Sequence, residues 1–145
     1  MRVSDTFVAH IERLEGFRAA LYDDTGGVAT IGYGHVPEPG ESFAGRTLTR
    51  TEALCILKRD IREAEAAVNL HVTVPLKQEQ FDALVSFVFN VGEDAFMNST
   101  MLRKLNAGHC CAVVDEFRRW KYDNGRAVRG LALRREAEIA LYVGS

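Results

Sequence analysis

The chain has 145 residues, a common size for one domain and enough to bury one well-packed core. Its hydrophobic content of 47% and charged content of 26% are those of an ordinary globular protein and exclude a disordered or fibrous chain. The net charge is −2, but residues 1–100 carry 9 Lys/Arg against 15 Asp/Glu, whereas residues 101–145 carry 9 against 5. The basic end suits an anionic polymer, yet cations and interleaved aromatics are too few for a nucleic-acid interface. We therefore expect no nucleic-acid partner.

The three cysteines, Cys55, Cys110 and Cys111, are odd in number and two are adjacent, which argues against a disulfide framework and for a reducing compartment. We expect them to be small buried side chains. The four histidines lie far apart, without the spacing of a metal or haem site, so no metal or cofactor is expected. The N-terminus lacks an apolar run of signal-peptide length, and no segment approaches the ~20 apolar residues of a membrane span. We expect a monomer without a membrane anchor.

A helix is expected at the N-terminus, capped by Ser4 or Asp5 and ended by Gly16, because its apolar residues recur at three and four. Glu15 then lies at the C-terminal end of this helix. Two short β-prone runs, over residues 17–22 and 28–33, flank a turn rich in Asp and Gly, which predicts a β-hairpin. Residues 37–45 contain too much Pro and Gly for a helix and predict a loop with at most one more short strand.

The rest of the chain predicts helices. A capping box of Thr49 and Glu52 begins a long helix whose apolar stripe continues to Val68. Residues 81–89 are apolar on most faces, which indicates the central buried helix, ended near Gly92. Shorter helices are expected after a cap at Ser99 or Thr100, over residues 110–120, and from Arg129 onward.

Glu15 and Asp24 offer the two carboxyl groups that hydrolysis of a glycosidic bond requires. One must still hold a proton for the leaving oxygen, and the other must serve the attacking water. The negative end of a helix disfavours a carboxylate at Glu15, whereas turn N–H groups favour one at Asp24. Thr30 lies six residues beyond Asp24, so the return strand brings its hydroxyl near that carboxylate. Asp24 and Thr30 together would hold one water, which favours inversion at the sugar carbon.

These residues lie in segments that resemble the signature of phage-type lysozymes, glycoside hydrolase family 24. The segments are Glu15-Gly16-Phe17-Arg18, Leu21-Tyr22-Asp23-Asp24-Thr25-Gly26-Gly27 and Ala29-Thr30-Ile31-Gly32-Tyr33-Gly34-His35. In that family a Glu, an Asp nine residues on and a Thr six further form the catalytic triad, and Glu15, Asp24 and Thr30 match in type and spacing. The resemblance extends over nearly the whole chain, through residues 89–93, 99–100, 105–108, 120 and 130–136.

The resemblance implies an endolysin that hydrolyses the β-1,4 bond between N-acetylmuramic acid and N-acetylglucosamine in bacterial peptidoglycan, with inversion, to lyse the host. It implies no cofactor. Because no signal peptide is seen, we expect accumulation in the host cytoplasm until holin-dependent release to the periplasm. Two alternatives stay open: a catalytically idle wall-binding or phage-structural domain, and a lytic transglycosylase that forms an anhydro sugar without water. The intact set of Glu15, Asp24 and Thr30 argues against the first, and Asp24 with Thr30 favours hydrolysis over the second.

The implied fold is α+β and lysozyme-like, with a small β-hairpin lobe and a larger helical lobe joined by a long helix. We expect one lysozyme-like domain over residues 1–145. The small lobe covers approximately residues 14–50, and the helical lobe covers approximately residues 70–145 plus the N-terminal helix. The active cleft is expected between the two lobes.

The resemblance also implies substrate-binding residues. Val36, Phe89 and Asn90 match cleft positions, where apolar surface and one amide suit N-acetyl sugars, although Phe89 fits an interlobe core equally well. The family places a basic residue across the cleft from the catalytic Glu, and here Arg126 is the first choice and Arg129 the second.

His35 and Asp23 each leave a question. His35 is expected to be structural, paired with Asp60 on the long helix by resemblance, which would raise the pKa of His35. Asp23 stands beside Asp24 and points to the opposite side of the hairpin. The nine-residue spacing selects Asp24, but a hairpin register slipped by one residue would give its role to Asp23.

Overall fold

The computed structural model describes residues 1–24 and 26–144; Thr25, which the sequence places in the hairpin turn, and Ser145 lie outside the described residues. The chain divides into two compact units. One, here called the hairpin unit, is Thr6–Arg62, and the other, the helical unit, joins Met1–Asp5 to the residues from Glu63 onward. The boundary falls inside the long helix α2 (Arg50–His71). This division places the N-terminal helix with the hairpin, whereas the sequence assigned it to the helical lobe.

The hairpin unit begins with helix α1 (Phe7–Glu15), which buries Phe7 and Ile11. The helix ends as expected, where the N–H of Gly16 donates to the carbonyl of Glu12 at 3.0 Å. Its expected cap is wrong, because Thr6 is the N-cap residue and makes no side-chain capping bond.

Ser4 does not cap α1 because its polar groups are used within the helical unit. Its hydroxyl donates to Oδ2 of Asp82 at 2.5 Å, and its N–H donates to Oδ1 of the same carboxylate at 3.1 Å. A side chain committed to Asp82 is not available to the N–H groups of a helix.

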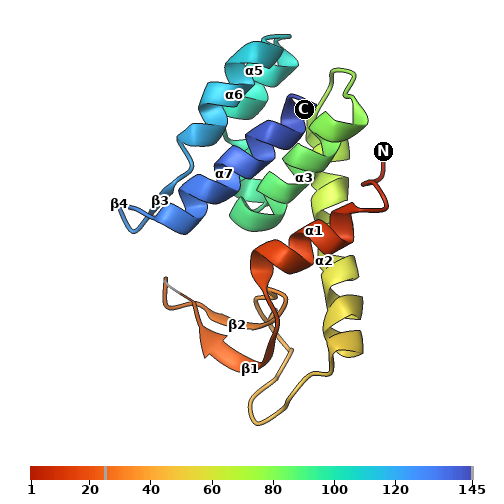
Figure 1. Cartoon of the computed structure of the whole chain (residues 1–145), viewed down its shortest axis with the longest axis vertical. Helices are drawn as coiled ribbons and strands as arrows, with labels where there is room; N and C mark the ends of the chain where they lie inside the picture. Colours follow the sequence, from red (N-terminus) through yellow and green to blue (C-terminus); the bar gives the residue numbers. More distant parts are fainter. Residues whose placement is uncertain (25, 145) are drawn as a thin grey trace. The chain divides into compact units, whose positions relative to one another are not determined.

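The predicted hairpin is present, with strands β1 (Arg18–Asp23) and β2 (Ala29–Gly32) antiparallel (Figure 1). Tyr22 lies opposite Thr30 and Asp23 opposite Ala29, with a bulge before Tyr22. After β2 the chain turns tightly, and Ile31 and His35 exchange two backbone hydrogen bonds of 2.9 Å each. Residues 36–49 form a loop in which the structure has no strand.

Helix α2 starts at the expected capping box. The N–H of Glu52 donates to Oγ1 of Thr49, and the N–H of Thr49 donates to Oε1 of Glu52, both at 3.1 Å. The buried apolar side chains of the hairpin unit come from α1, from β2 and the turn after it, from the loop and from the first half of α2: Phe7, Ile11, Ile31, Tyr33, Phe43, Leu48, Ala53, Leu57 and Ile61. The core thus fixes both the hairpin and the loop against the first half of α2.

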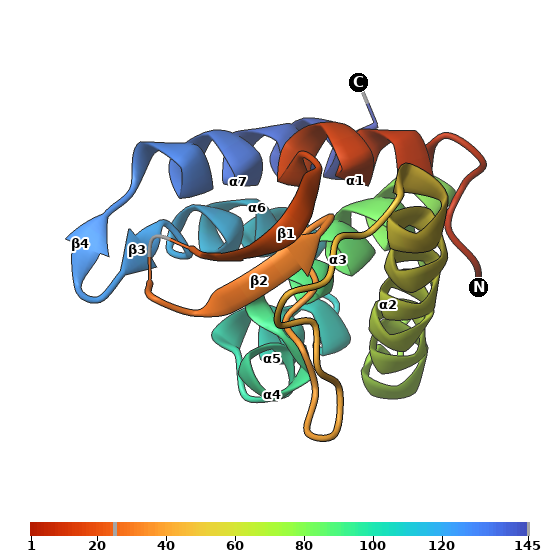
Figure 2. The same cartoon turned by 90° about the horizontal axis from the view of Figure 1, so that it is seen from below.

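The helical unit is built around α3 (Gln78–Val91), in which every residue from Phe81 to Val88 is buried, as the all-round apolar pattern predicts. Besides the second half of α2, the unit contains α4 (Glu93–Met97), α5 (Thr100–Asn106), α6 (Cys110–Arg118) and α7 (Arg129–Tyr142). Helix α7 runs beside α3, and α6 packs between α5 and α7 (Figures 1 and 2). Ser99 caps α5 as expected, by accepting the N–H of Leu102 at 3.1 Å.

Two elements of this unit are too short for periodicity to reveal. One is α4, and the other is a hairpin of β3 (Tyr122–Asp123) and β4 (Arg126–Ala127), which stands between α6 and α7 (Figure 2). The core of the unit centres on Phe87, whose ring meets three others at steep angles: Phe96, Phe117 and Trp120.

The expectation that the cysteines are buried is wrong. Cys55 and Cys111 are exposed, Cys110 is partly exposed, and all three are free. Cys55 lies off the buried stripe of α2, which runs through Ala53, Leu57 and Ile61. No described helix combines the length and the apolar character needed to cross a lipid bilayer.

Candidate active site

Glu15 is the last residue of α1, where the helix leads into β1, and its side chain is half-buried. Its carboxyl group lies directly against Gly34, in the tight turn after β2. A Cβ atom built on Gly34 would stand 2.5 Å from Oε2 of Glu15 and 2.9 Å from its Cδ. Gly34 also has a φ of +76°, a backbone conformation that other residues rarely adopt. A glycine at this position therefore gives the Glu15 carboxyl group the space that it occupies.

Asp24 closes the hairpin turn with its own carboxylate. Its Oδ1 accepts the N–H of Gly26 at 2.9 Å and the N–H of Val28 at 2.8 Å. Its backbone N–H donates to the carbonyl of Val28, and its carbonyl accepts from Gly27, both at 2.9 Å. No described residue donates to the second carboxylate oxygen, Oδ2, which is exposed with the rest of the side chain. One oxygen thus holds the turn and the other is open to a water molecule.

Thr30 is buried on the return strand, and its hydroxyl donates to the carbonyl of Val28 at 2.9 Å. Val28 therefore connects the two candidate residues, because its N–H is bound to Asp24 and its carbonyl to Thr30. The register places Asp24 and Thr30 on one face of the hairpin. Thr30 lies opposite Tyr22, and Asp24 follows Tyr22 by two residues, so its side chain points to the same face as that of Tyr22. Asp23 lies opposite Ala29 and so belongs to the other face.

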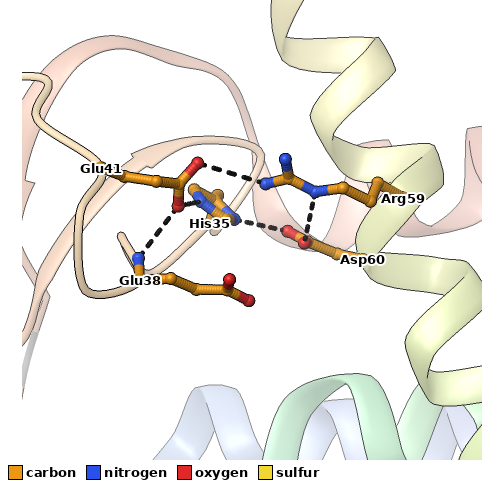
Figure 3. Close-up of polar contacts among 5 residues, drawn as sticks. All are labelled: His35, Glu38, Glu41, Arg59 and Asp60. Atoms are coloured by element: carbon orange, nitrogen blue, oxygen red, sulfur yellow. Dashed lines mark hydrogen bonds and ion pairs between the residues drawn. The ribbon is translucent and has the colours of Figure 1, made fainter.

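His35 lies between two carboxylates, one from the loop and one from α2 (Figure 3). Its Nδ1 is 2.7 Å from Oδ2 of Asp60, which is the expected pair, and its Nε2 is 2.8 Å from Oε1 of Glu41. Arg59 is 3.4 Å from Oε2 of Glu41 and 4.0 Å from Oδ1 of Asp60. The cluster attaches the loop to α2, and its histidine directly follows Gly34 in the chain.

The charges of this cluster act on each other. Burial lowers the pKa of His35, but its hydrogen bonds to Glu41 and Asp60 outweigh burial, so the pKa of His35 is raised above 6.5. The N–H of Glu38, with His35 next, lowers the pKa of Glu41 to about 2. Burial raises the pKa of Asp60, against the opposing effect of His35. A protonated His35 between two carboxylates is the state that these directions favour.

The proposed binding residues are distributed over both units. Val36 follows His35 and is exposed in the hairpin unit. Phe89 and Asn90 are neighbours near the end of α3, with Phe89 half-buried and Asn90 exposed, and Oδ1 of Asn90 accepts a hydrogen bond from Arg135 at 2.8 Å. Arg126 is exposed on β4 and makes no ion pair with a described residue. Within the described ranges, no three His, Cys, Asp or Glu side chains are grouped as ligands for a metal ion.

The model of the family described as Phage lysozyme matches residues 12–138. The chain belongs to the phage lysozyme family. It is 40% identical to the endolysin of Salmonella phage P22, over 99% of both chains. The solved endolysin from Escherichia coli O157:H7 phage FAHEc1 is similar in fold, with a TM-score of 0.86 and 33% identity over 99% of this chain and 94% of that one. The muramidase domain of SpmX from Asticaccaulis excentricus is also similar, with a TM-score of 0.85 and 34% identity over 99% of both chains.

Membership of the phage lysozyme family confirms the expected fold class and the expected class of activity. The protein is a glycoside hydrolase of the lysozyme type, a muramidase endolysin that serves host lysis. The alternative of a catalytically idle structural domain is correspondingly disfavoured.

Three neighbours of the candidate residues are absent from the sequence-based prediction. Gly34 stands there only as a member of a segment that resembles the family, without its contact to Glu15. Glu41 lies in a loop, where no periodicity indicates that it faces His35. Arg135 is 45 residues from Asn90, and its only local signal is a spacing of three residues to Glu138, typical of an ion pair within a helix.

Proposed function

We propose that this phage lysozyme cleaves the β-1,4 bond between N-acetylmuramic acid and N-acetylglucosamine with inversion, within a single lysozyme-like domain. Glu15 donates its proton to the leaving oxygen. Asp24 accepts a proton from a water molecule that it holds with Thr30, and this water attacks the anomeric carbon from the opposite face. His35 and Asp60 maintain the structure near Glu15. Four further residues contact the substrate: Val36, Phe89, Asn90 and Arg126.

The observation that carries this proposal is the pairing of Asp24 with Thr30 through Val28. The Thr30 hydroxyl donates its proton to the Val28 carbonyl, which leaves its oxygen lone pairs to accept from a water. Oδ2 of Asp24 is an acceptor on the same face of the hairpin. Two acceptors on one face suit a water that gives up a proton to the carboxylate as its oxygen attacks carbon.

The anomeric configuration of the first product tests inversion. We expect the α-anomer of the new reducing end in early 1H NMR spectra of digested, soluble peptidoglycan strands, before mutarotation mixes the anomers. A first product in the β-configuration would contradict a water held by Asp24 and Thr30. Mass spectra of the same digest should contain hydrated reducing ends, whereas anhydro sugars would identify a lytic transglycosylase.

We also propose that the protein acts as a monomer and reaches the periplasm only when a holin opens the inner membrane. Its membership of the phage lysozyme family supports action on the wall. Induced cells should then lyse when a holin is expressed with the protein and should stay intact without it. Lysis without a holin would contradict this route.

A further inference from the structure

Asn90 carries the amide on α3 that the proposed function assigns to substrate, and this amide is held in one orientation. Its Oδ1 accepts a hydrogen bond of 2.8 Å from Nη2 of Arg135. A guanidinium can only donate, so the atom that faces it must be the oxygen of the amide and not the nitrogen. The NH2 group of Asn90 therefore points away from Arg135, and no described residue accepts a hydrogen bond from it.

Arg135 is itself fixed on several sides. It is 1% exposed, and its Nε lies 2.7 Å from Oε1 of Glu138. Its Nη1 donates to the carbonyl of Trp120 at 3.4 Å, and its guanidinium carbon stands 5.0 Å from the centre of the Phe87 ring. A planar guanidinium held by a carboxylate, a carbonyl and a ring face has little rotational freedom. The donor that it presents to Asn90 is therefore set before any ligand arrives.

Glu138 is in turn fully buried, and it accepts the hydroxyl of Ser86 at 2.6 Å. Its Oε2 also lies 3.5 Å from Nε of Arg134. Burying an ion group of this size costs solvation free energy, which its internal contacts offset, and removing one member leaves the others unpaired. Most of the cluster stabilises α3 against α7. The contact of Arg135 with Asn90 also joins these two helices, and it differs from the others because Asn90 is an exposed polar residue.

We propose that Arg135 is a positioning residue for substrate binding, which fixes the Asn90 amide so that its two N–H groups face a carbonyl oxygen of the glycan strand, such as that of an N-acetyl group. This inference rests on the proposed function. A freely rotating amide presents its oxygen and its nitrogen to the ligand in turn, and only the nitrogen donates to a carbonyl. Holding the oxygen avoids the entropy loss of orienting the amide on binding.

A double-mutant cycle tests the proposal. The variants are Asn90→Ala, Arg135→Lys and the two combined, assayed for kcat and KM by release of reducing ends from soluble, uncross-linked peptidoglycan strands. Lysine keeps the charge opposite Glu138 but cannot offer the fork of donors that reaches Asn90. We expect each single variant to raise KM about 5-fold to 10-fold, the scale of one lost hydrogen bond. The double variant should have the KM of Asn90→Ala, because Arg135 acts on substrate only through Asn90.

The unfolding free energy of the same proteins separates positioning from general destabilisation. Arg135→Lys should still lower it in the Asn90→Ala background, by less only because the bond to Asn90 is already absent there, even though its effect on KM disappears in that background. Ser86→Ala is the matched control, since it removes a contact of Glu138 without touching Asn90. It should lower stability and leave KM at the wild-type value.

Three results would overturn the inference. One is an Arg135→Lys effect on KM that persists undiminished in the Asn90→Ala background. Another is a wild-type KM for Asn90→Ala while wild-type hydrolysis proceeds, which would remove the proposed substrate contact of Asn90 and leave the proposed reaction standing. Wild-type protein that releases no reducing ends would instead remove the proposed function, and this inference with it.

If Arg135→Lys does not fold, Asn90→Asp decides the question. Its carboxylate still accepts from Arg135 but has no N–H to offer, so the protein should fold and KM should rise about as much as in Asn90→Ala. A wild-type KM for Asn90→Asp would overturn the assignment of a donor.

Discussion

The two units position their polar groups by different means. In the hairpin unit, the backbone positions the groups near the proposed chemistry. The N–H groups of its own turn bind Asp24, and the missing side chain of Gly34 leaves room for the carboxyl group of Glu15. In the helical unit, Asn90 is held by a buried side chain, Arg135, which belongs to another helix. Local turns tolerate exposure to water, whereas a positioning guanidinium needs a complete set of buried partners.

The ionic clusters of the two units differ in the same way. His35 is only 3% exposed, but its partner Glu41 is 25% exposed and Arg59 is 50% exposed. Water and pH therefore act on the His35 cluster. Glu138 and Arg135 are at 0% and 1% exposure, so their cluster is shielded from water. Loss of a partner should be mild in the first cluster and severe in the second.

The largest effect on the reaction rate is expected from a substitution in the turn of the hairpin unit. Asp24→Asn keeps an oxygen that accepts the N–H groups of Gly26 and Val28, so the turn should persist while the proton acceptor is lost. We predict a rate of reducing-end release about 10²-fold to 10⁴-fold below wild type. Asp23→Asn, on the other face of the hairpin, is the matched control and should stay near the wild-type rate. The opposite ranking of these two variants would mean that Asp23 carries the role.

Substitution of a carboxylate in each ionic cluster tests the contrast between them. Glu138→Gln leaves Arg134 and Arg135 without a buried counter-charge, and we predict a loss of about 3 to 5 kcal/mol in unfolding free energy. Glu41→Gln should cost at most about 1 kcal/mol, because Glu41 itself and Arg59 are partly in water and Asp60 still faces His35. Guanidinium denaturation at neutral pH measures both. Equal losses would remove the distinction between an insulated and a solvated cluster.

Gly34→Ala tests whether backbone space positions Glu15. The added Cβ would overlap the Glu15 carboxyl group, so that group must move, and a displacement of this kind is expected to lower the rate about 100-fold. Gly45→Ala is the matched control, since Gly45 has a similar φ of +71° but nothing within 4 Å. Both variants should lose about 1 kcal/mol or more of stability to backbone strain. Only Gly34→Ala should lose activity; full activity would contradict the positioning role.

The smallest effect expected is the pH dependence of the His35 cluster. Because the pKa of His35 is raised in the folded state, its stabilising effect is complete below its ordinary value of 6.5 and is lost as pH rises through the folded value. The pKa of Glu41 is lowered to about 2, so its effect is present above its ordinary value of 4.5 and is lost as pH falls toward 2.

Urea unfolding of wild type and His35→Asn over a pH series measures this effect, and their difference should shrink on the alkaline side. An NMR titration with an unshifted His35 would contradict the account.

The sequence predicts the hairpin unit well where local chemistry decides. The turn around Asp24, the stop at Gly16 and the capping box at Thr49 each depend on residues within a few positions, and each is present. The expected cap at Ser4 fails because a partner 78 residues away takes its side chain. The sequence pattern within one helix or strand carries no information about contacts between residues so far apart in the chain.

The same limit applies to the site. The spacing of Glu15, Asp24 and Thr30 is readable because all three lie along one hairpin and the helix before it. Arg135 contacts Asn90 although the two are 45 residues apart in the sequence. Glu41, the partner of His35, comes from a loop without periodicity. Such partners are set by packing of whole elements, so the sequence indicates the groups proposed for chemistry and omits those that hold them.

The most direct test of the central claim is the activity of Glu15→Gln. Glutamine has nearly the shape of glutamate but no proton to give to the leaving oxygen. We predict a protein with wild-type circular dichroism and wild-type unfolding that neither releases reducing ends nor clears permeabilised Gram-negative cells. A folded Glu15→Gln protein that cleaves peptidoglycan at near the wild-type rate would contradict this claim.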